Sequence, residues 1–397
     1  MRILFVVDGR SPIALNWIGY FIRGDHEIHL VSTFPCQPPQ GLATFWMTPV
    51  AFSGVKTTLG RIASRKDQLA GRNWLGQAGW VGLRTRLRQW LGLLTFSGAN
   101  RRLAEVVRQV QPDLIHAMRI PYEGIITAMA VERLSSMPRL LISVWGNDFT
   151  LHATANPWMG AFTRRALKQA SALHTDCLRD QRLAYQWGFQ AGKPAVVLPG
   201  GGGVQMDQFF PPSERQAGNL RVINPRGVRA YVRNDTFFKA IPRVLEKFPT
   251  ARFICPAMAG EPQVMRWLRE LRIEGSVELL PPQPREDMAY LFRQAQVAVS
   301  PSTHDGTPNT LLEAMACGCY PVAGDIESLR EWITPGLNGA LVDPGDAGGL
   351  AEAICEGLEN TELRRKAAAY NLALVAERAE YSKVMQLAES FYERIAG

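Results

Sequence analysis

Apolar residues recur along this chain at two spacings, and the two spacings alternate. Short apolar runs predict buried strands, whereas segments with apolar positions three or four residues apart predict helices. Strands that alternate with helices form parallel sheets covered by helices on both faces. The first half of the chain predicts strands at Arg2–Val7, Glu27–Ser32, Asp113–His116, Arg139–Trp145 and Ala195–Leu198, and helices at Ile13–Ile22, Asn100–Val110, Gly124–Leu134 and Ala161–Ala170.

The alternation stops near the middle of the chain and then restarts. Pro199 is followed by the run Gly200 to Gly203, and Pro211-Pro212 come soon after, which is typical of a flexible hinge. We therefore predict an N-terminal domain at 1–200, with a basic insertion near 54–102, and a C-terminal domain at 201–397. The second half predicts strands at Arg221–Asn224, Arg252–Cys255, Val277–Leu280, Val297–Ser300, Tyr320–Ala323 and Ala340–Val342, and helices at Thr236–Lys247, Pro262–Leu271, Met288–Gln294, Asn309–Cys317 and Ser328–Trp332.

The fold class that follows is α/β, with two Rossmann-like domains that face each other across a cleft. A chain of 397 residues exceeds one ordinary core. From about Ala347 onward it is helical and charged, and its last helix is a candidate to pack back on the first domain. Ligands of such sheets bind at the carboxyl ends of the strands. The residues that follow predicted strands there are Asp8-Gly9-Arg10, His116, Gly146-Asn147-Asp148, Arg226 and Asp305.

The stretch 302–318 predicts a helix whose start binds an anion. Thr307 is a good N-cap, Pro308 suits the first helical position, and Gly318 ends the helix. The free N–H groups of the first turn would point out of the helix, where a diphosphate binds well. The positions that we expect to meet the diphosphate are Gly306, Asn309, Thr310 and Leu311.

Two carboxylates bracket this helix start. Asp305 precedes it and Glu313 lies about two turns in, within an apolar run where an unpaired carboxylate is rarely buried. One carboxylate can reach the group on one side of the diphosphate and the other can reach the opposite group. A nucleotide-sugar fits this arrangement, because it carries a ribose at one end of the diphosphate and a sugar at the other.

Other classes of protein are disfavoured by what the sequence contains. The six cysteines are scattered and the six histidines form no His-x-x-x-His pair, so we expect reduced thiols and neither a cofactor nor a metal. No Gly-x-Gly-x-x-Gly follows the first strand of either domain, which disfavours an oxidoreductase. No apolar run reaches the length of a membrane span, and Met1–Asp8 suits a buried strand better than a signal sequence. We therefore expect a cytoplasmic protein.

The net charge of +8 is concentrated in one segment. Ten basic residues and one acid lie between Lys56 and Arg102, which leaves the remainder of the chain near −1. Trp90 and several leucines recur there at helical spacing, so the segment predicts either a basic amphipathic helix on an anionic membrane, at its inner face, or a helix that packs these residues inward. Nucleic acid is disfavoured as a partner, because no binding module is recognisable.

The region Val299–Asp346 resembles the signature region of group 1 (family 4) glycosyltransferases of the GT-B fold. The resemblance rests on an acid, seven residues and a glutamate, then Ala-Met-Ala-x-Gly, a Pro-Val strand and a Gly-x-x-Gly-x-Leu-Val-x-Pro-x-Asp ending. Weaker similarity covers much of the chain. The matching segments are Asp305…Glu313-Ala-Met-Ala-Cys-Gly318, Pro321-Val-Ala, Gly336-Leu-Asn-Gly339, Leu341–Asp346, Asp25–Val31, Pro112–His116, Trp145–Asp148 and Leu198-Pro-Gly-Gly.

The resemblance implies a hexosyl-type enzyme that moves a sugar from a nucleotide-diphosphate donor to an acceptor glycan or glycolipid, with retention and without a metal. It implies that Glu313 binds the ribose and Asp305 meets the donor sugar. For the phosphate cations it implies Arg226 and then Arg229 or Arg233, of which we favour Arg233. Its remaining implied positions are Gly9 on the donor side, His116 as catalytic and Asp148 on the acceptor side.

Three departures from the family pattern leave alternatives open. The first acid is Asp305 rather than the commoner Glu, Met118 occupies a position where many relatives have His, and the loop at Gly9 has one glycine where relatives often have two. A nucleotide-sugar epimerase on the same fold would release an isomerised sugar without an acceptor. A non-catalytic nucleotide-sugar-binding subunit is the other alternative. His116 could also be a structural histidine, and Asp148 could cap the turn that follows it.

Overall fold

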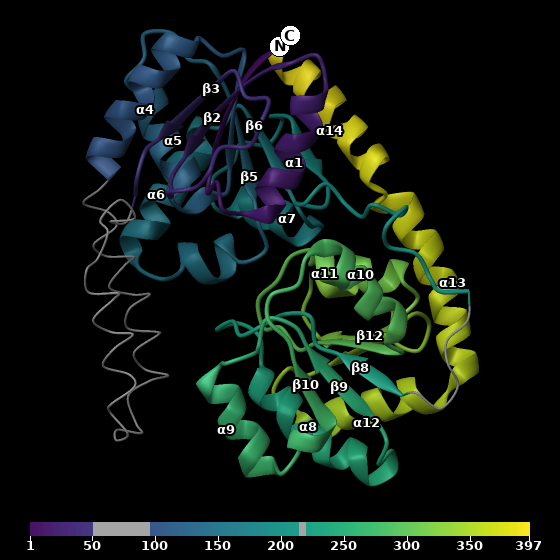
Figure 1. The fold of residues 1–397 in the computed structure, drawn as a ribbon. Helices are drawn as coiled ribbons and strands as arrows, with labels where there is room; N and C mark the ends of the chain where they lie inside the picture. Colours follow the sequence, from purple (N-terminus) through teal and green to yellow (C-terminus); the bar gives the residue numbers. More distant parts are fainter. Residues whose placement is uncertain (51–95, 214–219) are drawn as a thin grey trace, which may run out of the picture.

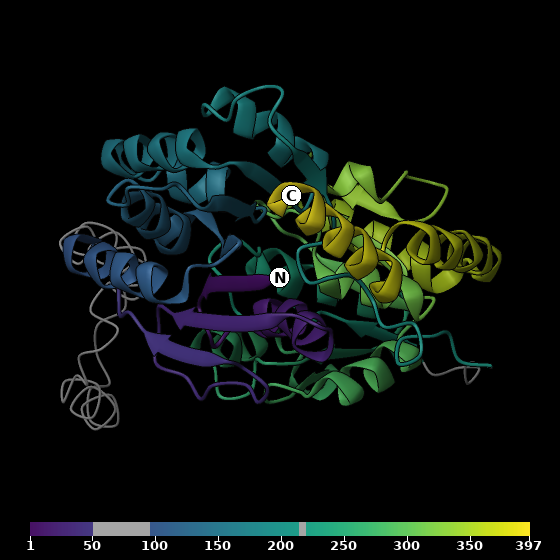
Figure 2. The same cartoon turned by 90° about the horizontal axis from the view of Figure 1, so that it is seen from above.

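Two parallel sheets, each covered by helices on both faces, make up the protein. The computed structural model describes residues 1–50, 96–213 and 220–397. The first sheet is built from residues before Leu198 and the second from residues after Leu220. Figure 1 shows the two as separate halves, and Figure 2 shows them from above. This architecture is the α/β fold that the alternating pattern predicts.

The first sheet has the strand order β3-β2-β1-β4-β5-β6-β7, with all neighbours parallel. Its strands are β1 (Arg2–Val7), β2 (Glu27–Ser32), β3 (Thr44–Met47), β4 (Leu114–Met118), β5 (Arg139–Val144), β6 (Ala172–Thr175) and β7 (Ala195–Val197). The helices of this half are α1 (Pro12–Arg23), α4 (Phe96–Val110), α5 (Ile125–Val131), α6 (Pro157–Gln169) and α7 (Leu178–Gln186), with π-helical turns η2 (Ile120–Gly124) and η3 (Asp148–Ala153).

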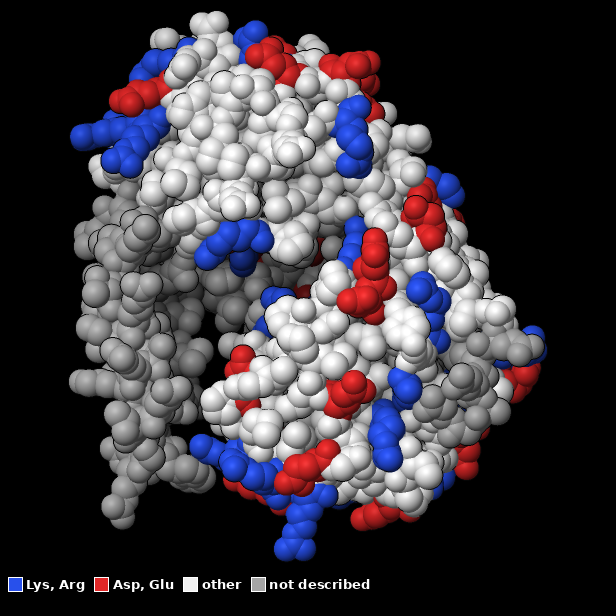
Figure 3. Space-filling model, viewed as in Figure 1, with Lys and Arg blue, Asp and Glu red and all other residues white. Residues whose placement is uncertain are grey.

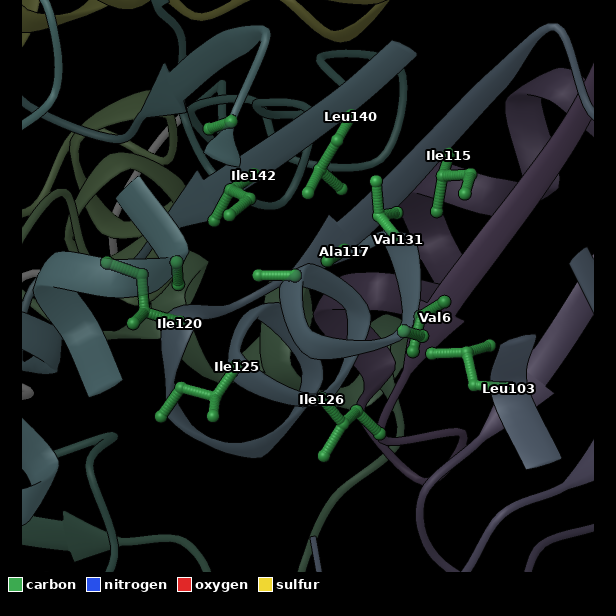
Figure 4. Packing of buried hydrophobic residues seen from close by; sticks show 14 of the residues in the cluster. Val6, Leu103, Ile115, Ala117, Ile120, Ile125, Ile126, Val131, Leu140 and Ile142 are labelled. Atoms are coloured by element: carbon green, nitrogen blue, oxygen red, sulfur yellow. The ribbon is translucent and has the colours of Figure 1, made fainter. Parts of the chain in front are cut away.

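Helices cover both faces of the first sheet and most residues of its strands are buried, which explains why apolar residues predominate in them. Along β1, Leu4 and Val6 face a cluster covered by α4, α5 and α6, whereas Phe5 and Val7 face a cluster that contains α1. Figure 4 shows the first cluster, in which side chains of β1, β4 and β5 meet those of α4 and α5.

The second sheet has the order β10-β9-β8-β11-β12-β13, again all parallel. Helices α8, α9 and α12 cover one face, and α10, α11 and α13 cover the other. Its strands are β8 (Arg221–Ile223), β9 (Arg252–Cys255), β10 (Val277–Leu279), β11 (Val297–Ser300), β12 (Tyr320–Gly324) and β13 (Ala340–Val342). The helices are α8 (Asn234–Lys247), α9 (Pro262–Leu271), α10 (Arg285–Gln294), α11 (Asn309–Ala316), α12 (Ala347–Glu359) and α13 (Thr361–Arg378), with 3-10 turns η4 (Glu274–Ser276) and η5 (Leu329–Glu331).

The last helix, α14 (Tyr381–Ala396), returns to the first half of the molecule and brings the C-terminus beside the N-terminus (Figure 1). Its buried residues join the cluster of β1 and α1. The Tyr392 hydroxyl accepts a 2.8 Å hydrogen bond from Trp17 Nε1 and also pairs with Nδ1 of His116. The helix therefore covers a sheet whose last strand, β7, ends 184 residues before the helix begins.

The chain crosses between the two halves at two adjacent places. One crossing follows Gly203 and the other lies at Ala379–Tyr381, and they pair because Val204 N–H donates to the Ala379 carbonyl at 2.7 Å. A Cβ at Gly203, whose φ is +88°, would lie 2.2 Å from that carbonyl oxygen. The glycine run therefore lets the two crossings approach each other, and the boundary at 200 stays a prediction.

The structure differs from the predicted elements mainly in short or polar segments. The sequence pattern gave no prediction for β3, β6 and α7, because four-residue strands and a polar helix carry little periodicity. Most of the basic insertion, including Lys56, Trp90 and the arginines between them, lies outside the described residues. Among the helices that the structure describes, none combines the length and the apolar character that crossing a membrane requires.

Replacing Tyr392 by Phe tests how firmly α14 is held. The ring keeps its stacking on Phe21, with centroids 4.6 Å apart, but Trp17 and His116 each lose a buried hydrogen-bond partner. We expect the free energy of unfolding, measured in urea, to fall by about 1–3 kcal/mol. Tyr370→Phe on α13, where the side chain is 45% exposed, serves as the control and should change little. Equal stabilities for both variants would contradict this role of Tyr392.

Candidate functional site

A cavity of about 1770 Å³ lies between the two halves, at the carboxyl ends of both sheets. Its walls come from the segments after β1, β2, β4, β5 and β6 on one side and after β8, β9, β10 and β11 on the other. Figure 3 shows the hollow between the halves, with basic and acidic side chains at its rim. Of the predicted site residues, the cavity wall contains Arg226, Asp305, Asn309, Thr310 and Glu313.

Helix α11 points its first turn into this cavity. It begins at Asn309, with Pro308 as its N-cap, and not with Thr307 as predicted. The Thr307 hydroxyl has another partner, because it donates to the Asp176 carbonyl of the opposite half. Among the described residues, the N–H groups of Asn309 and Thr310 have no hydrogen-bond acceptor. They carry the positive end of the helix dipole, so this turn can bind an anion.

Arg226 and Asp305 form an ion pair beside the helix start. Arg226 Nη2 lies 2.6 Å from Asp305 Oδ2, and Nη1 donates to the Thr310 hydroxyl at 3.2 Å. Both side chains are nearly buried, with 9% and 13% exposure. Arg226 Nε is buried and has no partner among the described residues. The guanidinium therefore has one buried donor that no partner in the described part of the chain satisfies.

Glu313 lies deeper in the cavity, next to a cation that the sequence did not single out. Arg285 Nη2, at the start of α10, is 3.5 Å from Glu313 Oε1. Arg285 Nη1 also donates to Asn16 Oδ1 of α1 at 3.1 Å, so it bridges the two halves. Burial raises the pKa of Glu313 to about 7, against the opposing attraction of Arg285. Near neutral pH this carboxyl can both donate and accept hydrogen bonds.

The two candidates for the second phosphate cation, Arg229 and Arg233, lie in different places. Arg233 is 41% exposed and forms a bidentate pair with Asp235, away from the cavity wall. Arg229 and Tyr231 line the cavity instead, and Arg229 Nη1 donates to the Tyr231 hydroxyl at 3.2 Å. We predicted Arg233 rather than Arg229 as the second phosphate cation, and the structure favours Arg229 instead. Arg233 lies at the start of α8, where its guanidinium pairs with Asp235.

Three glycine or backbone positions predicted on the donor side also lie elsewhere. Gly9 is buried, and its N–H donates to Ser32 Oγ at 3.1 Å instead of facing the cavity. The Leu311 N–H is used within the helix start, by the Pro308 carbonyl. Gly306 packs against the opposite half, where an added Cβ would lie 2.3 Å from the Asp176 carboxylate. None of the three lines the cavity.

His116 is a structural histidine in this fold. It is fully buried under α14, where Nδ1 pairs with the Tyr392 hydroxyl and Nε2 pairs with Ser143 Oγ at 2.6 Å. Burial, with a smaller contribution from His174, lowers its pKa well below the usual value, so the ring is neutral. The predicted catalytic role is therefore corrected, because the β4 pleat turns this side chain to the face that α14 covers.

Asp148, predicted on the acceptor side, forms an ion pair with Arg119. Its side chain is fully buried, and Oδ1 lies 3.0 Å from Arg119 Nε. Its other oxygen accepts the N–H groups of Ile120 and Trp145, each at 3.1 Å, so it also caps the turn at the end of β5. Arg119 lines the cavity and Asp148 does not. Asp148 therefore positions Arg119 at the cavity wall, and its acceptor-side role stays a prediction.

Asp176 holds the two halves together at the cavity edge. It accepts hydrogen bonds from the Gly146 N–H at 3.3 Å and from the Thr307 N–H at 3.4 Å, which belong to opposite halves. Burial and the neighbouring Asp180 raise its pKa well above the usual value. An added Cβ at Gly146 would lie 1.7 Å from the Gly306 nitrogen. The close approach of the halves therefore requires a glycine at Gly146.

Sequence reasoning missed several cavity residues that carry charge or a titratable group. Arg285, Glu123 and Asp176 come from segments without a recognisable motif. The signal that could have located Arg285 is the proline-rich loop before it, because Pro282 and Gln283 of that loop are part of the cavity wall. Asp176 is the first residue after β6. Its place at the carboxyl end of a strand could have identified it as a cavity residue, but the strand has only four residues and was not predicted.

Comparison with known families gives two adjacent matches. The Glycosyl transferases group 1 family matches residues 228–360, and the Glycosyl transferase 4-like family matches residues 82–176. The D-inositol 3-phosphate glycosyltransferase of Mycolicibacterium smegmatis is 32% identical over 197 residues, which are 47% of this chain and 44% of that protein. The matched part thus spans less than half of the curated relative.

Two solved structures share the whole architecture. Anabaena Alr3699/HepE, in complex with UDP and glucose, has a TM-score of 0.72 at 18% identity, with 99% of this chain and 100% of the other covered. Sucrose-phosphate synthase from Thermosynechococcus elongatus has a TM-score of 0.73 at 14% identity, with 100% and 99% covered. The fold is therefore GT-B, as the resemblance implied.

The raised pKa of Glu313 predicts a pH-dependent loss of stability. Between about pH 4.5 and 7 the unfolded chain releases this proton while the folded protein keeps it, so the free energy of unfolding falls as pH rises. We expect Glu313→Gln to gain stability relative to the wild type across this range, by on the order of 3 kcal/mol at most. Urea titrations at pH 5 and 7.5 measure the difference, with exposed Glu377→Gln on α13 as the control. A gap between wild type and Glu313→Gln that does not widen with pH would contradict the shift.

Proposed function

We propose that this chain, a member of the group 1 glycosyltransferases, transfers a hexose from a nucleoside-diphosphate sugar to an acceptor held by the first half of the molecule. The observation that carries the proposal is the α11 start, where Arg226, Asp305 and two free N–H groups converge beside Glu313. A diphosphate, a sugar and a ribose each find a matching group there. The Anabaena structure contains UDP and glucose, which supports this class of donor.

The donor replaces existing ion pairs in this proposal. The diphosphate replaces Asp305 as the ion-pair partner of Arg226, and it also accepts hydrogen bonds from the N–H groups of Asn309 and Thr310. Asp305 is then available to hydrogen-bond the hydroxyls of the sugar. Glu313 binds the ribose hydroxyls in place of Arg285. Charge-assisted hydrogen bonds of this kind are the stronger ones in proteins, which favours the exchange.

Transfer is proposed to retain the configuration of the anomeric carbon. The bond between that carbon and the diphosphate oxygen breaks, and the acceptor oxygen bonds to the same face. The acceptor proton passes to the departing diphosphate, so no protein base is consumed. Arg226 and Arg229 oppose the negative charge that grows on the diphosphate. We propose that these cations make a metal ion unnecessary, so that chelation with EDTA leaves the rate unchanged.

Donor binding is tested by calorimetry after a thermal-shift screen of UDP-, GDP- and ADP-sugars, since a bound ligand raises apparent stability. Glu313→Ala and Arg226→Ala should each lower the affinity for the selected donor at least tenfold. Arg233→Ala should stay within about twofold of the wild type, because its guanidinium pairs with Asp235 outside the cavity. Wild-type affinity in Glu313→Ala would rule out its role, and an equal loss in Arg233→Ala would restore the sequence-based assignment. Product analysis then separates transfer from isomerisation and from binding alone.

We also propose that the basic segment brings the enzyme to an anionic membrane surface, where a lipid-linked acceptor would be available. The support is its sequence alone, which places arginines beside tryptophans and leucines at helical spacing. Flotation with vesicles of phosphatidylglycerol and phosphatidylcholine measures the association. We expect the triple change Arg84→Glu, Arg86→Glu and Arg88→Glu to abolish flotation at physiological salt. Unchanged flotation of that variant would contradict the proposal.

A further inference from the structure

The first sheet has a crevice of its own at the carboxyl ends of β1 and β4. β1 lies between β2 and β4, so the chain leaves β1 toward one side and leaves β4 toward the other. The segments Asp8–Arg10 and Arg119–Glu123 follow these strands, and both contribute to the cavity wall. In the second sheet, β8 and β11 have the same relation, and Arg226 and Asp305 follow them. Such switch points are where open parallel sheets bind ligands.

The crevice contains a buried carboxyl group that the proposed donor site does not use. Glu123 is 2% exposed, yet it is part of the cavity wall. The Thr33 hydroxyl lies within hydrogen-bond reach of both Glu123 Oε1 and the Val7 carbonyl. One hydroxyl proton serves only one of these acceptors. A neutral Glu123 that donates to Thr33 satisfies both contacts. Burial raises the pKa of Glu123 to about 8, although Thr33 and Arg119 lower it in part, which agrees with this arrangement.

The backbone around Glu123 is held in an unusual conformation. Arg119 has φ +127° and Tyr122 has φ +67°, which are rare for residues with a side chain. Ile120 and Ile125 on either side are buried in the core of the sheet, as Figure 4 shows. The Thr127 hydroxyl donates to the Glu123 carbonyl at 2.6 Å. The surrounding packing thus fixes a strained turn that places one carboxyl at the cavity, and such strain gathers at functional sites.

The charges of the crevice are balanced within the protein. Arg10 pairs with Asp8 at 2.8 Å, and Arg119 pairs with Asp148 at 3.0 Å. With a largely neutral Glu123, the crevice has no net charge to offer an anionic ligand. The exposed side chain of Ile13 adds an apolar surface to the same wall. This combination suits a molecule that has hydroxyl groups and an apolar ring face.

We propose that the crevice between β1 and β4 binds a neutral, polyhydroxylated acceptor, a sugar or polyol, and that Glu123 hydrogen-bonds to one of its hydroxyl groups. The proposal rests on the proposed function, and it replaces His116 and Asp148 with Glu123 as the acceptor-side group. Because the carboxyl proton is donated to Thr33, the remaining lone pairs of Glu123 can accept a hydrogen bond from a hydroxyl group of the acceptor. The partner hydroxyls come either from a soluble sugar or from the head of a glycolipid.

The experiment measures transfer from the donor selected by thermal shift to four acceptor probes. Myo-inositol and methyl α-D-glucopyranoside represent soluble acceptors, dodecyl β-D-glucopyranoside represents a glycolipid, and inositol 3-phosphate represents a charged acceptor. We expect the wild type to use at least one neutral probe in preference to the phosphate. Glu123→Ala should lower kcat/KM for that probe at least tenfold, with donor affinity and slow donor hydrolysis in water within twofold of the wild type. Glu123→Gln should recover most of the activity, since its amide also donates and accepts.

Two further variants keep the result interpretable. Thr33→Val removes the partner hydroxyl without changing the side-chain size, and it should raise the KM for the acceptor severalfold with little effect on kcat, even if Glu123→Ala fails to fold. Glu132→Gln is the matched control, because Glu132 is an exposed acid at the end of α5 that pairs with Arg165. It should behave like the wild type in every assay.

Failure of this inference differs from failure of the proposed function. A wild type that neither binds nor hydrolyses any nucleotide-sugar contradicts the proposed function itself. A wild type that binds donor but transfers only to inositol 3-phosphate, or to no probe, overturns the neutral acceptor. Transfer by Glu123→Ala at the wild-type rate, a parallel loss of donor affinity, or a Glu123→Gln variant as impaired as Glu123→Ala would each overturn the role of Glu123.

Discussion

The parallel order of the two sheets is the constraint on which the site depends. In each sheet the chain reverses its winding direction once, at β1 and β4 in the first and at β8 and β11 in the second. Loops on either side of such a point diverge, so a crevice forms without any residue chosen to make it. Because both crevices open into the same cavity, a ligand bound at one meets a ligand bound at the other. The fold thus creates the cavity in which two ligands can be in contact, and the side chains determine which ligands bind there.

Helix α14 and the paired crossings determine how the crevices can approach each other. The crossing at Val204 is hydrogen-bonded to the one at Ala379, so the two halves share one narrow connection. Across the cavity edge, Asp176 binds N–H groups from both halves and Gly146 touches the Gly306 backbone. Near α7 the N–H groups of Leu178 and Arg179 also donate to Glu331, and Arg182 donates to Glu327. The two halves are therefore joined on both sides of the cavity.

The sequence placed Asp305 and Glu313 at one helix start because the information for this placement is local. Asp305 precedes α11 and Glu313 lies within it, so their spacing along the chain brings both to the cavity wall. His116 failed for the opposite reason. The face of β4 that it occupies is covered by α14, and nothing near His116 encodes a contact with Tyr392. The same limit applies to Arg285 and Glu123, whose roles depend on residues that fold beside them from distant segments.

Two cavity cations, Arg226 and Arg285, each pair with a carboxyl group of the proposed donor site, and this arrangement bears on selectivity. The pair of Arg226 with Asp305 is largely buried, whereas Arg285 in the pair with Glu313 is 31% exposed. Removing one partner of a buried pair without replacement costs about 3–5 kcal/mol, because a charge is left uncompensated. A ligand therefore has to supply new partners for the groups that remain. Arg226 needs an anion in place of Asp305, and Glu313 needs hydroxyl groups in place of Arg285. Inorganic phosphate can satisfy only the first exchange, whereas a nucleoside diphosphate satisfies both at once. Because Glu313 has a pKa of about 7, its pair with Arg285 is the weaker one near neutral pH, and the ribose exchange is the easier step.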